Sequence, residues 1–508
     1  MFSAETLAGL SVKLDQIVQG FSLMLPEILV LGLLIVGIFV ELFIHGNSEK
    51  SSSSWRYFIS LLGLLFVLAL AFQRLQNGHN GFASFSLFWI TPASNAINLL
   101  ILALGFLILL VSQITGKKLS IEEQIGFFSI LSGSLLTGIS NHWLSLFLSI
   151  ELMSLGTYLL VGIRKDSEGA RAALPYVLFG MATSAIFLYG VSLMYGLSGT
   201  MSFSNPAFTR VFSSADPLFI GLSLGLISCA LLFKMSWAPF QPWSPDVLET
   251  LSAPWMAWIS IAPKIAVTWL GIRMIHFIPT DMSMYIAALA ILTLLIGNLG
   301  ALRQTNTKRL LAYSSIAHGG FMAMVWLSPA KEATEALLFY GLTYGLSTIL
   351  VFFLAEHQSE NGMDDVDNLD GWKGIAKSQP IKSLLLFIGF IALIGLPPAG
   401  TFLAKITYFS LLWESIEAHS SIATISLLGV AIFATAVSTS SNVADRPNEN
   451  RSELAARVAG TPIACRTWEG WRDPTMQADP LDAQTPSRSS AMRRLSASDA
   501  GKVTLAVL

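Results

Sequence analysis

The chain has 508 residues, of which 53% are apolar or aromatic and only 12% are charged, and its formal net charge is −2. Soluble domains average about 25% charged residues, so a soluble protein of ordinary composition, a disordered chain and a coiled coil are excluded. Apolar runs that are continuous rather than alternating also exclude an outer-membrane barrel. The composition therefore predicts an all-α polytopic membrane protein, and the small net charge predicts no nucleic-acid partner.

Residues 1–20 carry Glu5, Lys13 and Asp15 and lack the pattern of a signal peptide, so the first apolar run is expected to remain in the protein. Transmembrane segments must be helical here, because the bilayer core offers no water to backbone polar groups. Thirteen helices are expected, at 22–44, 57–72, 97–115, 125–139, 142–162, 174–197, 217–237, 254–277, 283–301, 308–327, 333–356, 381–405 and 421–440.

The distribution of Lys and Arg predicts the orientation of the chain. With the N-terminus on the outer side, thirteen of the Lys and Arg in the connections fall on the inner side and five on the outer side. Arg74 and Arg273 are among the five. This excess follows the positive-inside rule and predicts a periplasmic N-terminus.

Residues 1–440 are expected to form the transmembrane domain, and residues 441–508 differ from them in composition. All 32 Phe precede residue 441, and 17 charged residues follow it in the remaining 68. Two interpretations are open: a disordered polar tail, or a change of reading frame or a fusion to foreign sequence after Ser440. The second is favoured because the switch falls within the thirteenth predicted helix.

Among the ionisable residues inside or at the ends of predicted helices, where a charge costs about 3 kcal/mol or more on insertion scales, five are candidate functional residues. They are Glu151, Lys234, Lys264, His318 and Lys405, called the relay residues below. A carboxylate, lysines and a histidine in one membrane plane can relay protons, because neighbouring charges shift one another's proton affinity. The alternatives are a structural ion pair, a lysine that extends to the interface, and a packing histidine.

Further polar side chains near His318 could extend such a path, although hydroxyl groups also bind helices together. They are Tyr313, Ser314, Ser315, Tyr340 and Tyr344.

Prolines interrupt two of the predicted helices close to relay residues. Residues 239–245 hold three prolines just after Lys234, and Pro397 and Pro398 precede Lys405. Since proline cannot continue a helix, discontinuous helices are predicted near 234–245 and 395–405. The second interrupted helix is the fifth helix after the first, which predicts two inverted repeats of five helices, as in transporters. The alternative is that the prolines only kink packed helices.

The run from Phe233 to Glu249, FKMSWAPFQPWSPDVLE, resembles a signature of the antiporter-like membrane subunits of respiratory complex I. The segments 303–318 and 393–405 extend the resemblance, which covers about residues 20–440. With a lysine at position 405, the chain resembles the subunit N branch of that family, which is called subunit 2 in organelles. Gln241, Leu248 and residues 250–252 depart from the signature, and the family has fourteen helices where thirteen are predicted here.

The resemblance implies that Glu151 pairs with Lys234 and that Lys264 and Lys405 continue the path. It implies a proton-translocating subunit of NADH:quinone oxidoreductase in the bacterial inner membrane, surrounded by lipid and by the other membrane subunits of complex I. NAD(H), FMN, iron–sulfur clusters and quinone then belong to partner subunits. No cofactor or metal site is expected in this chain, whose two cysteines, Cys229 and Cys465, are too few for a cluster.

Two other functions are compatible with the sequence. One is a subunit of a multi-subunit cation/proton antiporter, which shares the fold and the relay. The other is a scaffold subunit that holds its neighbours and moves no protons.

Overall fold

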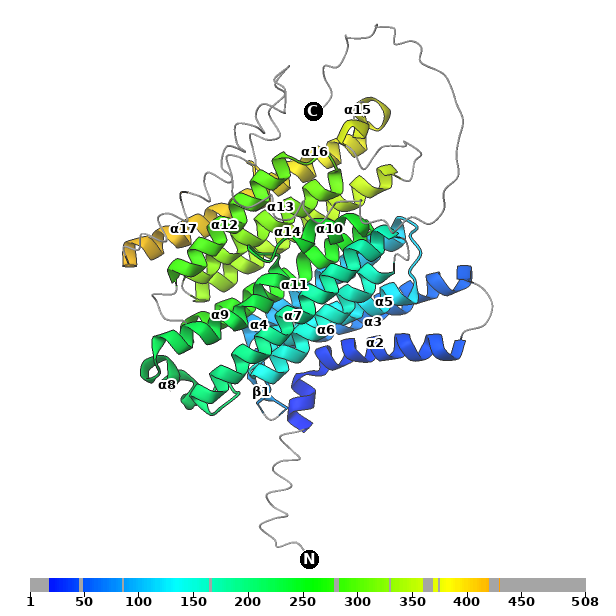
Figure 1. Ribbon diagram of the computed structural model, residues 1–508. Helices are drawn as coiled ribbons and strands as arrows, with labels where there is room; N and C mark the ends of the chain where they lie inside the picture. Colours follow the sequence, from blue (N-terminus) through cyan, green and yellow to red (C-terminus); the bar gives the residue numbers. More distant parts are fainter. Residues whose placement is uncertain are drawn as a thin grey trace, which may run out of the picture. The chain divides into compact units, whose positions relative to one another are not determined.

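The computed structural model describes residues 18–44, 49–84, 86–163, 167–277, 283–328, 330–359, 369–372, 375–419 and 429. The predicted helix 421–440 and the tail 441–508 lie outside these residues, apart from residue 429. Within the described part the chain is almost entirely helical (Figure 1). The longer helices are α2 (Leu25–Ile44), α3 (Glu49–Gln76), α4 (Pro92–Ile114), α5 (Ile121–Ile139), α6 (Trp143–Gly162), α7 (Ser167–Ser198), α9 (Pro217–Met235), α11 (Ala253–Met274), α12 (Ser283–Leu302), α13 (Thr307–Ala323), α14 (Ala330–Ser359), α16 (Pro380–Ile394) and α17 (Gly400–His419).

Short elements connect these helices. They are β1 (Gly81–Ala83), β2 (Phe88–Ile90), α8 (Pro206–Ser214), α10 (Trp243–Thr250), η1 (Ile275–Phe277), η3 (Met324–Leu327), η4 (Leu369–Trp372) and α15 (Ile375–Ser378).

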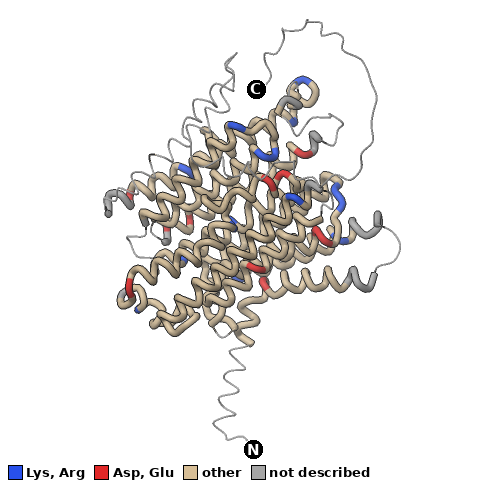
Figure 2. Tube along the Cα trace, in the orientation of Figure 1, with Lys and Arg blue, Asp and Glu red and all other residues tan. Residues whose placement is uncertain are grey.

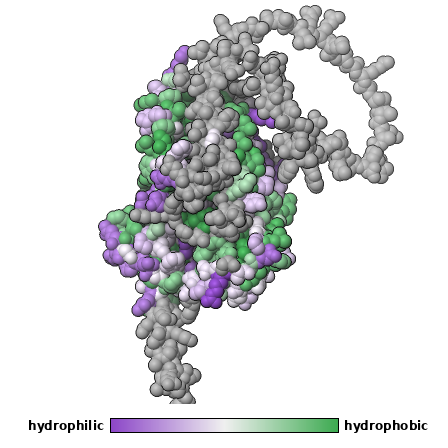
Figure 3. All heavy atoms as spheres, turned by 90° about the vertical axis from the view of Figure 1, so that its left-hand side faces the viewer, coloured by the Kyte–Doolittle hydropathy of each residue, from purple (hydrophilic) through white to green (hydrophobic). Residues whose placement is uncertain are grey.

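The prediction of an all-α polytopic membrane protein is confirmed. Among the described residues, nine helices are long and apolar enough to cross a membrane, and α2 and α16 contain shorter apolar helices. Large apolar side chains remain exposed on the outer helices, for example Phe66 on α3, Leu178 on α7 and Leu384 on α16. Figure 3 shows hydrophobic residues over large parts of one described face. Such a surface is stable against lipid rather than water.

Both predicted interruptions are confirmed, and they change where two of the predicted helices end. The predicted helix 381–405 is two helices, because α16 ends at Ile394 and α17 begins at Gly400. The predicted helix 217–237 ends at Met235, and the chain re-enters helix as α10. The prolines between these elements lack the N–H that a continuous helix needs.

Two connections hold structure that the sequence did not predict. The strands β1 and β2 pair antiparallel, with Phe82 opposite Trp89. Single β-bridges then join Phe88 to Ser140 and His142 to Ser202, so the strand pairing continues into two neighbouring connections. The second unpredicted element is α8, which the side chain of Asn205 caps by accepting a hydrogen bond from the main-chain N–H of Ala207 at 2.9 Å.

The core of the described residues surrounds α11. In the 18-residue apolar stretch of α11, 94% is buried inside the protein, whereas in the corresponding stretch of α3 only 28% is buried. It packs against α4, α5, α13 and α14, and Figure 1 shows it in the middle of these helices. Aromatic side chains fill the contact with α5, where the rings of Phe127 and Trp258 stack 4.9 Å apart. A charged residue on α11 is therefore shielded from lipid by protein on all sides.

Candidate functional site

The five relay residues come from five different helices. Glu151 lies on α6, Lys234 on α9, Lys264 on α11, His318 on α13 and Lys405 on α17. Lys264 and Lys405 are each 2% exposed, His318 is 3% exposed and Lys234 is 5% exposed, whereas Glu151 is only partly buried. Buried lysines are rare in proteins unless they are paired or functional.

The first interruption sets the position of Lys234, which lies in the last turn of α9. A helix end leaves its last carbonyls without partners unless other donors reach them. Here the main-chain N–H of Trp237 donates to the carbonyl of Leu232 at 2.9 Å. The indole of Trp243 donates to the carbonyl of Phe233 at 3.0 Å. These two donors satisfy two of the last carbonyls of α9, and the Lys234 side chain takes no part in this.

Glu151 and Lys234 form the first group of the site. The carboxylate of Glu151 accepts a hydrogen bond from the hydroxyl of Ser184 on α7, and it acts electrostatically on Lys234. The Lys234 ammonium lies 5.9 Å from the centroid of the Tyr158 ring. Its Nζ has no hydrogen-bond partner among the residues that the structure describes. The ammonium therefore keeps its donors available for water or for a carboxylate, as a proton carrier requires.

Lys264, Ser315, Tyr344 and His318 form a connected network across α11, α13 and α14. The ammonium of Lys264 donates to both the carbonyl and the hydroxyl of Ser315. That hydroxyl lies 3.2 Å from the Tyr344 hydroxyl, and the Tyr344 ring packs against His318 at 4.6 Å between centroids. His318 Nδ1 lies 2.8 Å from the hydroxyl of Tyr340. Groups that both donate and accept thus follow one another from the lysine to Tyr344, and ring packing rather than a hydrogen bond connects Tyr344 to His318.

Lys405 closes the second interruption. Its Nζ donates to the carbonyl of Ile394, the last residue of α16, at 2.7 Å, and lies 4.3 Å from the centroid of the Phe321 ring. A cation is favoured at a helix C-terminus. Gly395 ends the helix at φ 79, and a Cβ there would meet the Lys405 side chain at 3.1 Å. Glycine supplies both the backbone conformation and the space for the lysine.

The relay residues thus form two groups in the structure. Glu151 and Lys234 make one, and Lys264, His318 and Lys405 make the other, because the network above connects Lys264 with His318 and the Phe321 ring lies against both His318 and Lys405. Among the described contacts, no hydrogen bond or ion pair joins Lys234 to Lys264.

Sequence reasoning missed two side chains of the first group. Ser184 holds Glu151, and Tyr158 packs against Lys234. Their only sequence signal is polarity within an apolar helix, which many residues of this chain share. Of the hydroxyl groups named from the sequence, the structure places Ser315, Tyr340 and Tyr344 in the second group.

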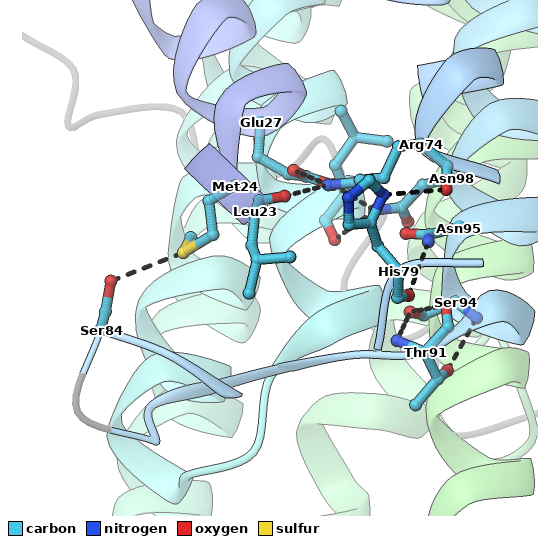
Figure 4. Close-up of polar contacts among 11 residues, drawn as sticks. Leu23, Met24, Glu27, Arg74, His79, Ser84, Thr91, Ser94, Asn95 and Asn98 are labelled. Atoms are coloured by element: carbon cyan, nitrogen blue, oxygen red, sulfur yellow. Dashed lines mark hydrogen bonds and ion pairs between the residues drawn. The ribbon is translucent and has the colours of Figure 1, made fainter. Parts of the chain in front are cut away.

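A further buried charge cluster joins the first four long helices (Figure 4). Arg74 of α3 makes two hydrogen bonds of 2.7 Å to the carboxylate of Glu27 on α2. The side chain of Asn98 on α4 donates to the same carboxylate at 2.9 Å and to the carbonyl of Leu135 on α5 at 3.2 Å. Arg74 also donates to the carbonyl of Leu23. The sequence placed Arg74 in an outer connection, whereas here it is buried and neutralised.

No group of three or more His, Cys, Asp or Glu side chains in the described part of the chain could hold a metal ion. The ionisable side chains of the site come one from each of five helices, and two of them, Lys234 and Lys405, lie next to the interruptions. Fold and site together define a class of protein: polytopic helical membrane proteins that place buried lysines, a glutamate and a histidine next to two discontinuous helices.

Comparison with known proteins gives the family. Residues 140–439 match the model of the NADH:quinone oxidoreductase/Mrp antiporter transmembrane family. The chain belongs to this family. It is 35% identical over 349 residues to the NADH-quinone oxidoreductase subunit N of Salinibacter ruber, a match that covers 67% of each chain. It is 32% identical over 416 residues to the NAD(P)H-quinone oxidoreductase subunit 2 of Rippkaea orientalis, covering 77% of this chain and 76% of that one.

A chain in the structure of respiratory complex I from Thermus thermophilus with bound aureothin has a similar fold. Its TM-score is 0.67 at 27% sequence identity, and the match covers 81% of this chain and 87% of that chain. The resemblance found in the sequence is therefore confirmed at the level of the family.

Proposed function

We propose that this chain is the proton-translocating membrane subunit of an NADH:quinone oxidoreductase. Protons move through Glu151, Lys234, Lys264, His318 and Lys405, and quinone reduction elsewhere in the complex drives them. The observation that carries this proposal is that three buried lysines, two of them at interrupted helices, share a protein interior with a buried histidine and a partly buried glutamate. Buried ionisable groups of this kind mark ion pathways in membrane proteins.

The proposal assigns the redox chemistry to partner subunits. NAD(H), FMN, iron–sulfur clusters and quinone are bound there, and the contacts of this chain are with the other membrane subunits and with lipid. The named relatives are quinone oxidoreductase subunits, which supports this assignment. The membrane is the bacterial inner membrane, and the N-terminus lies on the periplasmic side.

The test measures NADH-driven acidification of inside-out membrane vesicles that contain equal amounts of assembled complex. Lys234→Ala is compared with the native chain, and the exposed Arg171→Ala serves as the control. We expect acidification and quinone reductase activity to fall together in Lys234→Ala only. Unchanged acidification in Lys234→Ala would support the scaffold function instead.

The antiporter alternative predicts a different dependence on ions. The matched family includes Mrp antiporters, so the same vesicles should be tested with and without Na⁺. Acidification that requires Na⁺ but not NADH would place this chain in a cation/proton antiporter.

A further inference from the structure

Two tryptophans connect helices that carry relay residues from both groups. Trp237 follows the end of α9, three residues after Lys234, and is fully buried. Trp326 lies in η3, which directly follows α13 and its His318. The two ring centroids are 5.1 Å apart, and the ring planes meet at 36°. The connection after α9 is therefore packed against the connection after α13.

Trp326 is also fixed to the helix of Lys264. Its indole N–H donates to the carbonyl of Thr268 at 2.8 Å. The hydroxyl of Thr268 in turn donates to the carbonyl of Lys264, one turn earlier, at 2.7 Å. The ring occupies the place of a side chain at Gly271, where a Cβ would lie 2.1 Å from a ring atom. One hydrogen bond and one close approach thus hold Trp326 against α11.

Trp237 holds the interruption in place from the other side. A Cβ on Gly319, the residue after His318, would lie 3.1 Å from the Met235 carbonyl and 3.3 Å from Trp237 Nε1. Ser236 has a left-handed conformation with φ 57, which residues other than glycine adopt only when their surroundings hold them there. The main-chain N–H of Ala238 donates to the hydroxyl of Thr293 on α12 at 3.1 Å. The segment after Lys234 is thus held by contacts with its neighbours.

We propose that the Trp237–Trp326 pair positions the interruption after Lys234 relative to Lys264 and His318, and so transmits displacement between the two groups of relay residues. The tryptophans form a continuous packed path between the helices of Lys234 and Lys264. Close-packed rings cannot move independently of each other. The effect on pumping rests on the proposed function, while the positioning itself is a property of the fold.

The first test uses Trp326→Phe, which keeps a ring against Trp237 but removes the hydrogen bond to Thr268. Hydrogen–deuterium exchange of the peptide 232–238 is measured in the assembled complex, together with protons pumped per NADH oxidised. We expect exchange to rise about fivefold, the factor that corresponds to one net hydrogen bond. We expect the ratio of protons to NADH to fall with the amount of assembled complex unchanged.

The matched control is Trp255→Phe. The indole of Trp255 donates to the Glu123 carboxylate at 2.7 Å, so this variant also removes one indole hydrogen bond from α11. It should leave the exchange of residues 232–238 at the native rate. Unchanged exchange in Trp326→Phe, or an equal rise in Trp255→Phe, would overturn the proposal.

A second pair of variants covers the case in which Trp326→Phe prevents assembly. Trp237 Nε1 has no hydrogen-bond partner among the described residues, so Trp237→Phe should retain both slow exchange and pumping. Trp237→Leu loses the ring contact and should lose both. Equal behaviour of these two variants would overturn the proposal.

Pumping that survives Lys234→Ala would refute the proposed function alone, because the exchange measurement still decides whether the pair positions the interruption.

Discussion

Arg74 and Lys234 are equally buried, at 5% exposure each, but their surroundings differ in kind. Arg74 makes two hydrogen bonds with the Glu27 carboxylate and one with a main-chain carbonyl. Lys234 has an aromatic ring beside it and no hydrogen-bond acceptor in the described part of the chain. Paired donors and acceptors fix a charge in one place, whereas a lysine with unused donors can change partners. The first arrangement suits an anchor between helices and the second a proton carrier.

The anchor role of Arg74 predicts a loss of stability when one partner is removed. Arg74→Met leaves the Glu27 carboxylate buried without a cation, which costs about 3–5 kcal/mol in such pairs. The double variant Arg74→Met, Glu27→Leu removes both charges and should recover most of that loss. Thermal unfolding of the purified complex measures both effects, with Arg171→Met on the surface of α7 as the control. A double variant as unstable as the single one would show that the charge is not the cause.

At this scale the sequence indicated five ionisable residues that the structure buries wholly or partly, whose role as a relay stays a prediction, but it did not indicate most of their partners. A lysine or glutamate inside an apolar helix is rare, so it can be recognised from the sequence without knowing which residues surround it in the fold. The Ser184 hydroxyl at Glu151 and the Ser315 carbonyl at Lys264 depend on how α7 and α13 are rotated and packed. Serine is common in these helices, so no single position is conspicuous. The sequence also did not indicate which donor reaches the end of α9, because Trp243 lies beyond the interruption.

At the scale of elements, glycines set the distance between α5 and α6, the helix of Glu151. A Cβ on Gly156 of α6 would lie 2.7 Å from the carbonyl of Gly126 on α5 and 2.9 Å from Ile130. Real Cβ atoms do not come so close to a main-chain atom, so the two helices can pack at this distance only with glycine there. Small residues at helix contacts are the usual way to bring membrane helices together.

This close contact predicts opposite outcomes for two glycines of the same helix. Gly156→Ala forces α5 and α6 apart, and overpacking of this kind costs about 1–3 kcal/mol. At Gly162 a Cβ would meet nothing within 4 Å, so Gly162→Ala should leave stability unchanged or raise it slightly. The unfolding temperature of the complex, and the yield of assembled complex, compare the two variants. Equal effects at both positions would contradict the packing argument.

Hydropathy located the long helices but not the elements between them. The predicted helix 174–197 corresponds to α7, which begins at Ser167, because its first turns are polar and hold Arg171. The strand pair β1–β2 and α8 carry too few residues for a periodic pattern to stand out. Both contact neighbours that are distant in sequence, because a bridge joins Phe88 of β2 to Ser140, and Phe208 of α8 packs against Trp143 and Phe277.

At the scale of the whole molecule, the charges are unequally distributed along the helices. Figure 2 shows many of the described Lys and Arg near the end where α4 finishes and α13 begins. Lys117, Lys118, Lys308 and Arg309 are among the residues at that end. Positive charge collects on the cytoplasmic side of membrane proteins. This end is therefore expected to face the cytoplasm.

Labelling of single cysteines tests this orientation. Asn77 follows α3 and Lys118 follows α4, and both side chains are exposed. The 23 residues of α4 between these ends span about 35 Å, enough to cross a bilayer. In a chain with Cys229→Ser and Cys465→Ser, a membrane-impermeant maleimide should label Asn77→Cys in intact spheroplasts and Lys118→Cys only after lysis. The reverse pattern would invert the orientation.

Three connections at the other end of these helices are joined by main-chain hydrogen bonds and by the side chain of Asn141. The N–H of Asn141 donates to the carbonyl of Leu87 at 2.8 Å, and the N–H of Phe203 donates to the carbonyl of Asn141 at 3.0 Å. Main-chain hydrogen bonds do not depend on which side chain a residue carries. Substitutions can therefore accumulate over evolutionary time at positions that contribute only main-chain groups, whereas the buried side chain of Asn141, which donates to the Ser86 carbonyl and lies within hydrogen-bond distance of the Ser204 hydroxyl, must be kept to hold the same helix ends.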